Sequence, residues 1–139
     1  MKAVADTSFI LAYMNKDDAW NSRCRSVFKA HETIHLPQST LSEVAFMLGR
    51  SGGNKRVAYF LNYLPTVEKL KLTNFTSQDL ARTAELLAKY ADTRVDFVDA
   101  SVAAVAERLN ITRILTLDQR DFQILRPNHI DHFELLPQA

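Results

Sequence analysis

The chain opens with Met1-Lys-Ala-Val-Ala-Asp6-Thr7-Ser8, a short apolar run that ends on an acid. If this run is a buried strand, the acid that follows it must be solvated or liganded. Further apolar runs that are typical of strands lie at 34–36, 67–72, 111–117 and 133–136. Apolar residues with helical spacing lie between them. Strands that alternate with helices predict an α/β fold, a three-layer α/β/α sandwich with a mostly parallel sheet.

The helical stripes run through 20–28, 41–48, 80–88 and 98–109. One more helix is expected to begin after Gly52-Gly53 and to stop before Pro65. Phe46 and Met47 fall outside the inward stripe of their helix, and Tyr59 and Tyr63 add aromatic groups to the next one. Apolar groups outside a core stripe favour a partner-binding surface, although scattered exposed apolar residues are also common.

The length of 139 residues fits one domain, which we place at 1–139. The lone Cys24 has no second cysteine for an internal disulfide, and an acid at position 6 interrupts any signal-peptide core. Both features predict a cytoplasmic protein. The apolar runs are too short to span a bilayer, so no membrane association is expected.

The net charge is +1, from 17 Lys and Arg against 16 Asp and Glu. Proteins that hold nucleic acid by bulk electrostatics are strongly basic, so any nucleic-acid contact must be local. The candidate cations are Arg50, Lys55, Arg56, Arg94 and Arg120. Each of them could also be an ordinary solvated surface charge.

Four acids, Asp6, Glu43, Asp99 and Asp118, each lie where a strand pattern gives way to a helix pattern. The carboxyl ends of parallel strands share one edge of a sheet, so the four side chains can converge there. Carboxylates crowded together repel one another and partly protonate unless cations are present. Mg²⁺ or Mn²⁺ is the expected cation and a phosphodiester the expected substrate.

Structural roles compete with this interpretation. Thr40 and Glu43 fit a capping box, and Asp96 could cap the helix that carries Asp99.

Asp118 could likewise cap a short helix that contains Asp121. The hydroxyl of Thr7 or Ser8 could donate to a phosphate oxygen, or could merely cap the first helix.

Four motifs occur in order: Ala5-Asp6-Thr7-Ser8, Ser42-Glu43-Val44, Asp96-Phe-Val-Asp99-Ala100 and Leu115-Thr-Leu-Asp118-Gln-Arg-Asp-Phe122. With them the chain resembles the PIN-domain family of metal-dependent ribonucleases, particularly the VapC-type toxins of toxin–antitoxin pairs. The resemblance implies an acidic site made of Asp6, Glu43, Asp99 and Asp118. It also implies a homodimer and a cognate antitoxin that inhibits the enzyme.

In such a site Asp6 and Asp99 would be the central metal ligands, with Asp96 and Thr116 close to them. Metal ligation by Asp118 and Asp96 is also expected, and Thr116 is a candidate for contact with the substrate. Glu43 and Asp118 would position the attacking water or bind a second ion, one of them serving as general base. The expected products carry a 5′-phosphate and a 3′-hydroxyl, because the nucleophile is water and not a ribose hydroxyl.

Other chemistries have less support. The four histidines lack a cysteine pair, and no glycine-rich phosphate loop exists. A phosphohydrolase with Asp6 as nucleophile would be expected to carry a second carboxylate at position 8, where the chain has Ser8. A catalytically silent binding module and a general RNA-processing PIN nuclease without an antitoxin remain as alternatives.

Overall fold

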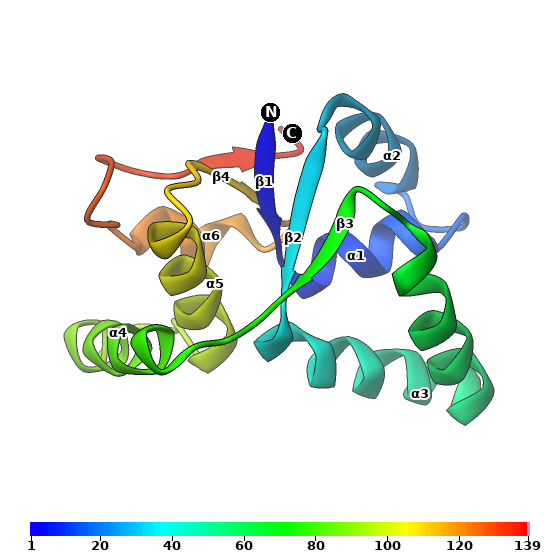
Figure 1. Ribbon diagram of the computed structural model, residues 1–139, viewed down its shortest axis with the longest axis horizontal. Coiled ribbons are helices and arrows are strands. Elements are labelled where there is room, and N and C mark those ends of the chain that lie inside the picture. The colour runs from blue at the N-terminus through cyan, green and yellow to red at the C-terminus, as the bar shows by residue number, and fades with distance from the viewer. Residues whose placement is uncertain (139) are drawn as a thin grey trace.

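A five-stranded parallel sheet runs through the middle of the molecule (Figure 1). The computed structural model describes residues 1–138. The strands are β1 (Lys2–Ala5), β2 (Thr33–Pro37), β3 (Leu70–Thr73), β4 (Arg113–Leu115) and β5 (Glu134–Leu136). Their order is β3-β2-β1-β4-β5, and every neighbouring pair is parallel. All five strand runs found in the sequence are therefore confirmed.

In the part of the chain that the structure describes, six α-helices and one short 3₁₀ helix connect the strands. They are α1 (Thr7–Met14), α2 (Asn21–Ala30), α3 (Gln38–Tyr63), η1 (Leu64–Thr66), α4 (Ser77–Lys89), α5 (Phe97–Arg108) and α6 (Gln119–Ile124). Within residues 1–138, none of these helices combines the length and the apolarity needed to cross a bilayer.

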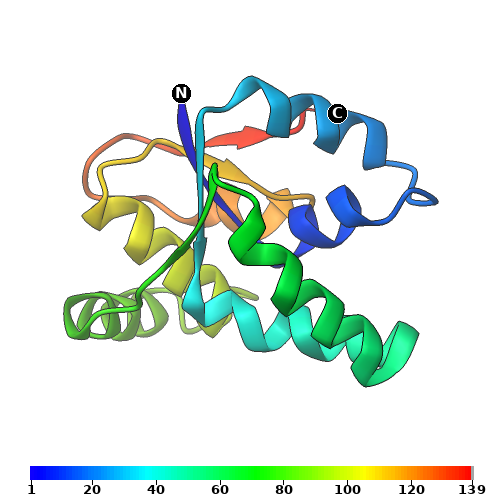
Figure 2. The ribbon, with the colours of Figure 1, turned by 45° about the vertical axis from the view of Figure 1, so that its right-hand side comes forward.

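The side chains of β1 alternate between two separate cores. Ala3 and Ala5 pack in the core that contains residues of α1, α2 and α3, whereas Val4 packs in the core that contains residues of α5. All three are fully buried. Leu115 and Ile114 of β4 divide in the same way. Because successive strand residues point to opposite faces, the sheet is covered on both sides, which confirms the three-layer sandwich (Figure 2).

Helix α3 is interrupted at Gly53, where φ is 70° and ψ is −171°. Glycine adopts a positive φ without steric cost, which explains why the helix breaks at this residue. The break lies where the sequence predicted the start of a new helix. The first half of α3 carries Glu43 and the exposed side chain of Phe46, and the second half carries the exposed side chain of Tyr59. The exposure expected for these aromatic groups is confirmed.

The chain reverses its direction across the sheet beside β1. It first runs outward from β1 to β2 and β3, and then returns to the other side of β1 with β4 and β5. Ligands of open α/β sheets bind at the carboxyl ends of the strands where the order reverses. In this protein that point lies between the ends of β1 and β4, which are followed by Asp6 and Thr116.

Candidate active site

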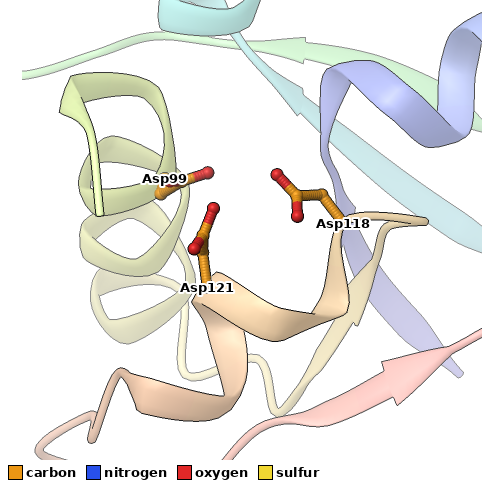
Figure 3. A group of neighbouring side chains, drawn as sticks. All are labelled: Asp99, Asp118 and Asp121. Atoms are coloured by element: carbon orange, nitrogen blue, oxygen red, sulfur yellow. The ribbon is translucent and has the colours of Figure 1, made fainter. Parts of the chain in front are cut away.

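Carboxylates converge at this switch point. Figure 3 shows Asp99, Asp118 and Asp121 pointing toward one another from α5, the loop after β4, and α6. One oxygen from each lies within 4.8 Å of the other two. The sequence had placed Asp99 and Asp118 in the site, and the structure brings them together.

Asp6 lies beside this group at the end of β1. Its side chain is buried, and Oδ2 accepts a hydrogen bond of 3.0 Å from the Thr116 hydroxyl. Burial raises the pKa of Asp6 to about 6, and the negative charges of Glu43 and Asp118 add to the rise. The proximity expected of Thr116 is thus observed, and Glu43 is near enough for its charge to act on Asp6.

Asp96 and Asp99 cap helix α5 reciprocally. Asp96 Oδ1 accepts from the Asp99 N–H at 2.9 Å, and Asp99 Oδ2 accepts from the Asp96 N–H at 3.1 Å. Burial raises the pKa of Asp99 to about 8, and the charges of Asp96 and Asp6 contribute to the rise. The capping role proposed for Asp96 is confirmed. It is compatible with a functional role for Asp99, because the cap uses only one of the two Asp99 carboxylate oxygens.

Asp121 is a member of the acidic group that sequence reasoning left out of the site. Its side chain is buried, and Oδ1 has no hydrogen-bond partner among the described residues. The pKa of Asp118 is raised by burial and by the charge of Asp121, while Arg94 and Arg120 act in the opposite direction. The signal was present, since residues three apart at the start of a helix share one face.

Two capping interpretations are wrong. Helix α3 begins at Gln38, and the Thr40 hydroxyl donates to the Pro37 carbonyl at 2.7 Å. No capping box therefore forms between Thr40 and Glu43. Asp118 stands at the N-cap position of α6 but makes no side-chain capping bond within residues 1–138. Both carboxylates are consequently free of the structural role that competed with function.

The hydroxyls after Asp6 do not cap α1 either, since its N-cap residue is Asp6 and no side-chain capping bond forms there in the described chain. Ser8 Oγ accepts from the Leu117 N–H at 2.9 Å and lies 3.2 Å from Thr116 Oγ1. Thr7 Oγ1 is buried with no partner among residues 1–138. Ser8 and Thr116 thus tie α1 to the loop that carries Asp118.

The basic candidates divide into two groups. Arg94 and Arg120 lie close enough to Asp118 to affect its pKa. Arg50 lies over the Phe46 ring at 5.8 Å, Arg56 donates to the Ser51 hydroxyl at 3.1 Å, and Lys55 is exposed next to it. Arg50 follows Glu43 by seven residues, which is about 10 Å along a helix axis. Contacts within α3 therefore account for Arg50 and Arg56.

The donor set fits a hard divalent cation. Mg²⁺ and Mn²⁺ are bound by carboxylate oxygens and retain waters. The site offers one oxygen from each of three carboxylates within 4.8 Å of one another, and a buried oxygen on Asp121 that has no partner among residues 1–138. Burial and mutual repulsion disfavour ionisation of these groups without a counter-charge, as the raised pKa values of Asp6 and Asp99 indicate.

The family model described as PIN domain matches residues 3–126 of this chain. The chain belongs to the PIN domain family. It is 27% identical over 137 residues to Ribonuclease VapC26 of Mycobacterium tuberculosis, a match that covers 96% of this chain and 99% of the relative.

Solved structures show the same fold. VapC20 of Mycobacterium tuberculosis, described as a sarcin–ricin loop cleaving toxin, superposes with a TM-score of 0.76 at 20% identity, over 86% of this chain and 92% of that one. VapBC2 of Rickettsia felis, bound to a DNA fragment from its promoter, superposes with a TM-score of 0.72 at 16% identity, over 99% of this chain and 100% of that one. This PIN domain therefore has the fold of VapC toxins.

Proposed function

We propose that this PIN domain is a Mg²⁺- or Mn²⁺-dependent endoribonuclease and acts as the toxin of a type II toxin–antitoxin pair. The observation that carries the proposal is the convergence of Asp99, Asp118 and Asp121 within 4.8 Å, next to Asp6. The similarity to Ribonuclease VapC26 supports RNA as the substrate.

In this proposal Asp6 and Asp99 hold the divalent cation, and Asp118 and Asp121 complete the acidic group, with Asp96 beside it. The bound cation would supply positive charge for the phosphate and a water of lowered pKa. Glu43 or Asp118 accepts the proton of the attacking water as general base.

The cations on the rim have a separate role. Arg94 and Arg120, next to Asp118, would attract the phosphates that flank the scissile bond. They would give the nearly neutral protein the local nucleic-acid contact that its net charge does not provide.

The partners we propose are a cognate antitoxin and a second copy of the chain. The structure of VapBC2 from Rickettsia felis, in which the matching chain has the same fold, supports an antitoxin partner. A cleft of about 280 Å³, lined by Leu11, Met14, Leu48 and Tyr59 together with Asn15 and Arg56, offers a largely apolar surface for an antitoxin helix. An Arg or Lys of the same antitoxin would bind the acids of the site. The exposed side chains of Phe46 and Met47 offer a surface for dimerisation. We place this pair in the cytoplasm.

Purified protein tests the enzymatic part. With Mg²⁺ or Mn²⁺ it should cleave a mixed RNA pool, and Asp6→Asn should lower the rate by about 10²-fold or more. Asp131→Asn, which removes an exposed acid outside the site, is the matched control and should cleave normally. Hydrolysis of a phosphomonoester without RNA cleavage would favour the phosphohydrolase alternative, and no reaction with either would favour a silent binding module.

Growth tests the toxin assignment. Induction of the wild-type chain in a bacterium should arrest growth, whereas Asp6→Asn should not, and co-expression of a small protein encoded beside it should restore growth. Vigorous growth with soluble, active wild-type protein would contradict the toxin assignment and favour a general RNA-processing nuclease. Arrest by both forms would show that catalysis is not the cause.

A further inference from the structure

A second cleft opens directly beside the acidic site. It has a volume of about 530 Å³, and its lining includes Trp20, Asp118, Gln119, Arg120 and Gln123. Asp118 belongs both to this lining and to the acidic group shown in Figure 3. Whatever occupies the cleft therefore lies next to the reacting phosphate of the proposed nuclease.

Trp20 is held in place as one wall of this cleft. The backbone N–H of Trp20 donates to Asp18 Oδ1 at 2.8 Å, and the side-chain amide of the adjacent Asn21 donates to two carbonyls of α1, those of Ala12 and Tyr13, each at 2.9 Å. The Arg23 guanidinium lies over the indole at 4.6 Å from the ring centroid, and Arg23 is not among the residues that line the cleft. The backbone at Trp20 is thus anchored to α1 before any ligand arrives, and the half-buried indole, which packs in part against the core, contributes to the lining of the cleft.

Polar side chains also line the cleft, together with Leu117 and Pro137. The Gln119 side chain donates from Nε2 to the carbonyls of Thr116 and Pro137 at 3.3 and 2.8 Å, which fixes the amide and leaves Oε1 as an acceptor. The side chains of Gln123 and Arg120 are exposed. An aromatic side chain, amides and a cation in one lining match a nucleotide, which offers a flat base, a hydrogen-bonding edge and an attached phosphate.

We propose that this cleft binds one nucleobase of the RNA beside the scissile phosphodiester, with Trp20 as the stacking platform and Gln123 and Arg120 as contacts to the nucleotide. The inference rests on the proposed ribonuclease activity and adds a substrate-recognition site to it. A protein helix fits this cleft less well, because the larger set of exposed apolar side chains, including Phe46 and Tyr59, lies elsewhere on α3.

Trp20 is the single tryptophan of the chain, so fluorescence excited selectively at tryptophan reports on the surroundings of this residue. Titration of the metal-free protein with AMP, GMP, CMP and UMP should give saturable quenching with at least one of them. Ribose 5-phosphate should give none, because it has a phosphate but no base. Free tryptophan amide corrects for light absorbed by the nucleotides.

Variants locate the effect. Gln123→Ala and Arg120→Gln, both at exposed positions, should weaken the nucleotide affinity several-fold, whereas Lys89→Gln, on α4, should not change it. In RNA cleavage Trp20→Leu should raise KM on the order of tenfold with little change in kcat, and Trp20→Phe should retain most of the affinity because it keeps an aromatic face.

Absence of quenching with all four nucleotides would overturn the proposal, as would equal quenching by ribose 5-phosphate. Equal affinities in Gln123→Ala, Arg120→Gln and wild type would also overturn it. RNA cleavage without quenching would remove this base site and leave the nuclease proposal standing. Quenching without RNA cleavage would support the nucleotide site and remove the nuclease proposal.

Discussion

The Thr116 hydroxyl donates a hydrogen bond of 3.0 Å to Oδ2 of Asp6, so the residue that follows β4 is bonded to the acid that follows β1. Thr116 is fully buried, and its Oγ1 also accepts from the Asp118 N–H at 3.0 Å. Since Thr116 donates its proton to Asp6, Ser8 is the donor in the 3.2 Å contact between the two hydroxyls. One buried hydroxyl therefore sets the relative position of two acids of the site.

Thr116→Val should remove these bonds with little change in shape. A hydrogen bond to a charged group contributes about 1.5–3 kcal/mol, and a comparable loss in the free energy of unfolding is expected at neutral pH. Thr116→Ser keeps the hydroxyl and should stay closer to wild type. Urea denaturation measures both, and equal stability of Thr116→Val and wild type would show that the hydroxyl does not support Asp6.

The metal-free protein should lose stability as the pH rises. The pKa values of Asp6 and Asp99 are raised from 3.8 to about 6 and about 8, so the folded state holds these protons more tightly than the unfolded state. The resulting stabilisation is complete below pH 3.8 and is lost as the pH passes through the two folded-state values. Melting temperatures measured in EDTA between pH 5 and 8 should fall for this reason, and less steeply in Asp99→Asn. If the melting temperatures of wild type and Asp99→Asn fell equally with pH, the raised pKa of Asp99 would be contradicted.

Asp121 should matter for the metal although the sequence did not place it in the site. Ligand at about 100 times Kd adds about 2.7 kcal/mol to the stability of a folded protein. Mg²⁺ or Mn²⁺ should therefore raise the melting temperature, and Asp121→Asn should reduce the rise, as should Asp6→Asn and Asp99→Asn. Asp131→Asn is the control with the same change in charge. An undiminished shift in Asp121→Asn would exclude Asp121 from metal binding.

The ion pair between Arg108 and Asp79 joins α5 to α4, with Nε donating to Oδ1 at 2.8 Å. Asp79 is only 1% exposed, so Arg108→Gln would leave a buried charge without its partner and should cost about 3 kcal/mol. Arg113→Gln breaks the exposed pair with Glu134 and should cost less than about 1 kcal/mol. Equal losses in thermal or urea unfolding would mean that burial does not decide the contribution of these pairs.

The spacing of the apolar residues was enough to predict the layers and all five strands. Side chains of β1 and β4 alternate between the two cores, and apolar stripes mark the buried faces of the helices, so this spacing follows directly from burial. Gly52-Gly53 likewise predicted the break in α3. The capping box at Thr40 was wrong because the strand leads into α3 two residues earlier, so Thr40 lies inside the helix.

The site was only partly predictable. Acids at strand ends could be found because parallel strands share an edge. The spacing of Asp118 and Asp121 could have placed Asp121 on the same face, but the burial of its Oδ1 without a partner among residues 1–138 depends on tertiary packing. The cleft between Trp20 and Gln119 could not be predicted, because its walls are far apart in the sequence and meet only in the folded chain.

The chemical nature of the cut RNA ends tests metal-activated hydrolysis by these acids most directly. With Mg²⁺ or Mn²⁺ the wild-type protein should leave a 5′-phosphate and a 3′-hydroxyl, detected by ligation-dependent end mapping, and the products should disappear in EDTA and with Asp6→Asn. Products with a 2′,3′-cyclic phosphate would show attack by a ribose hydroxyl and would contradict metal-activated hydrolysis. Cleavage that persists in EDTA and in Asp6→Asn would contradict a role for the acidic site in catalysis.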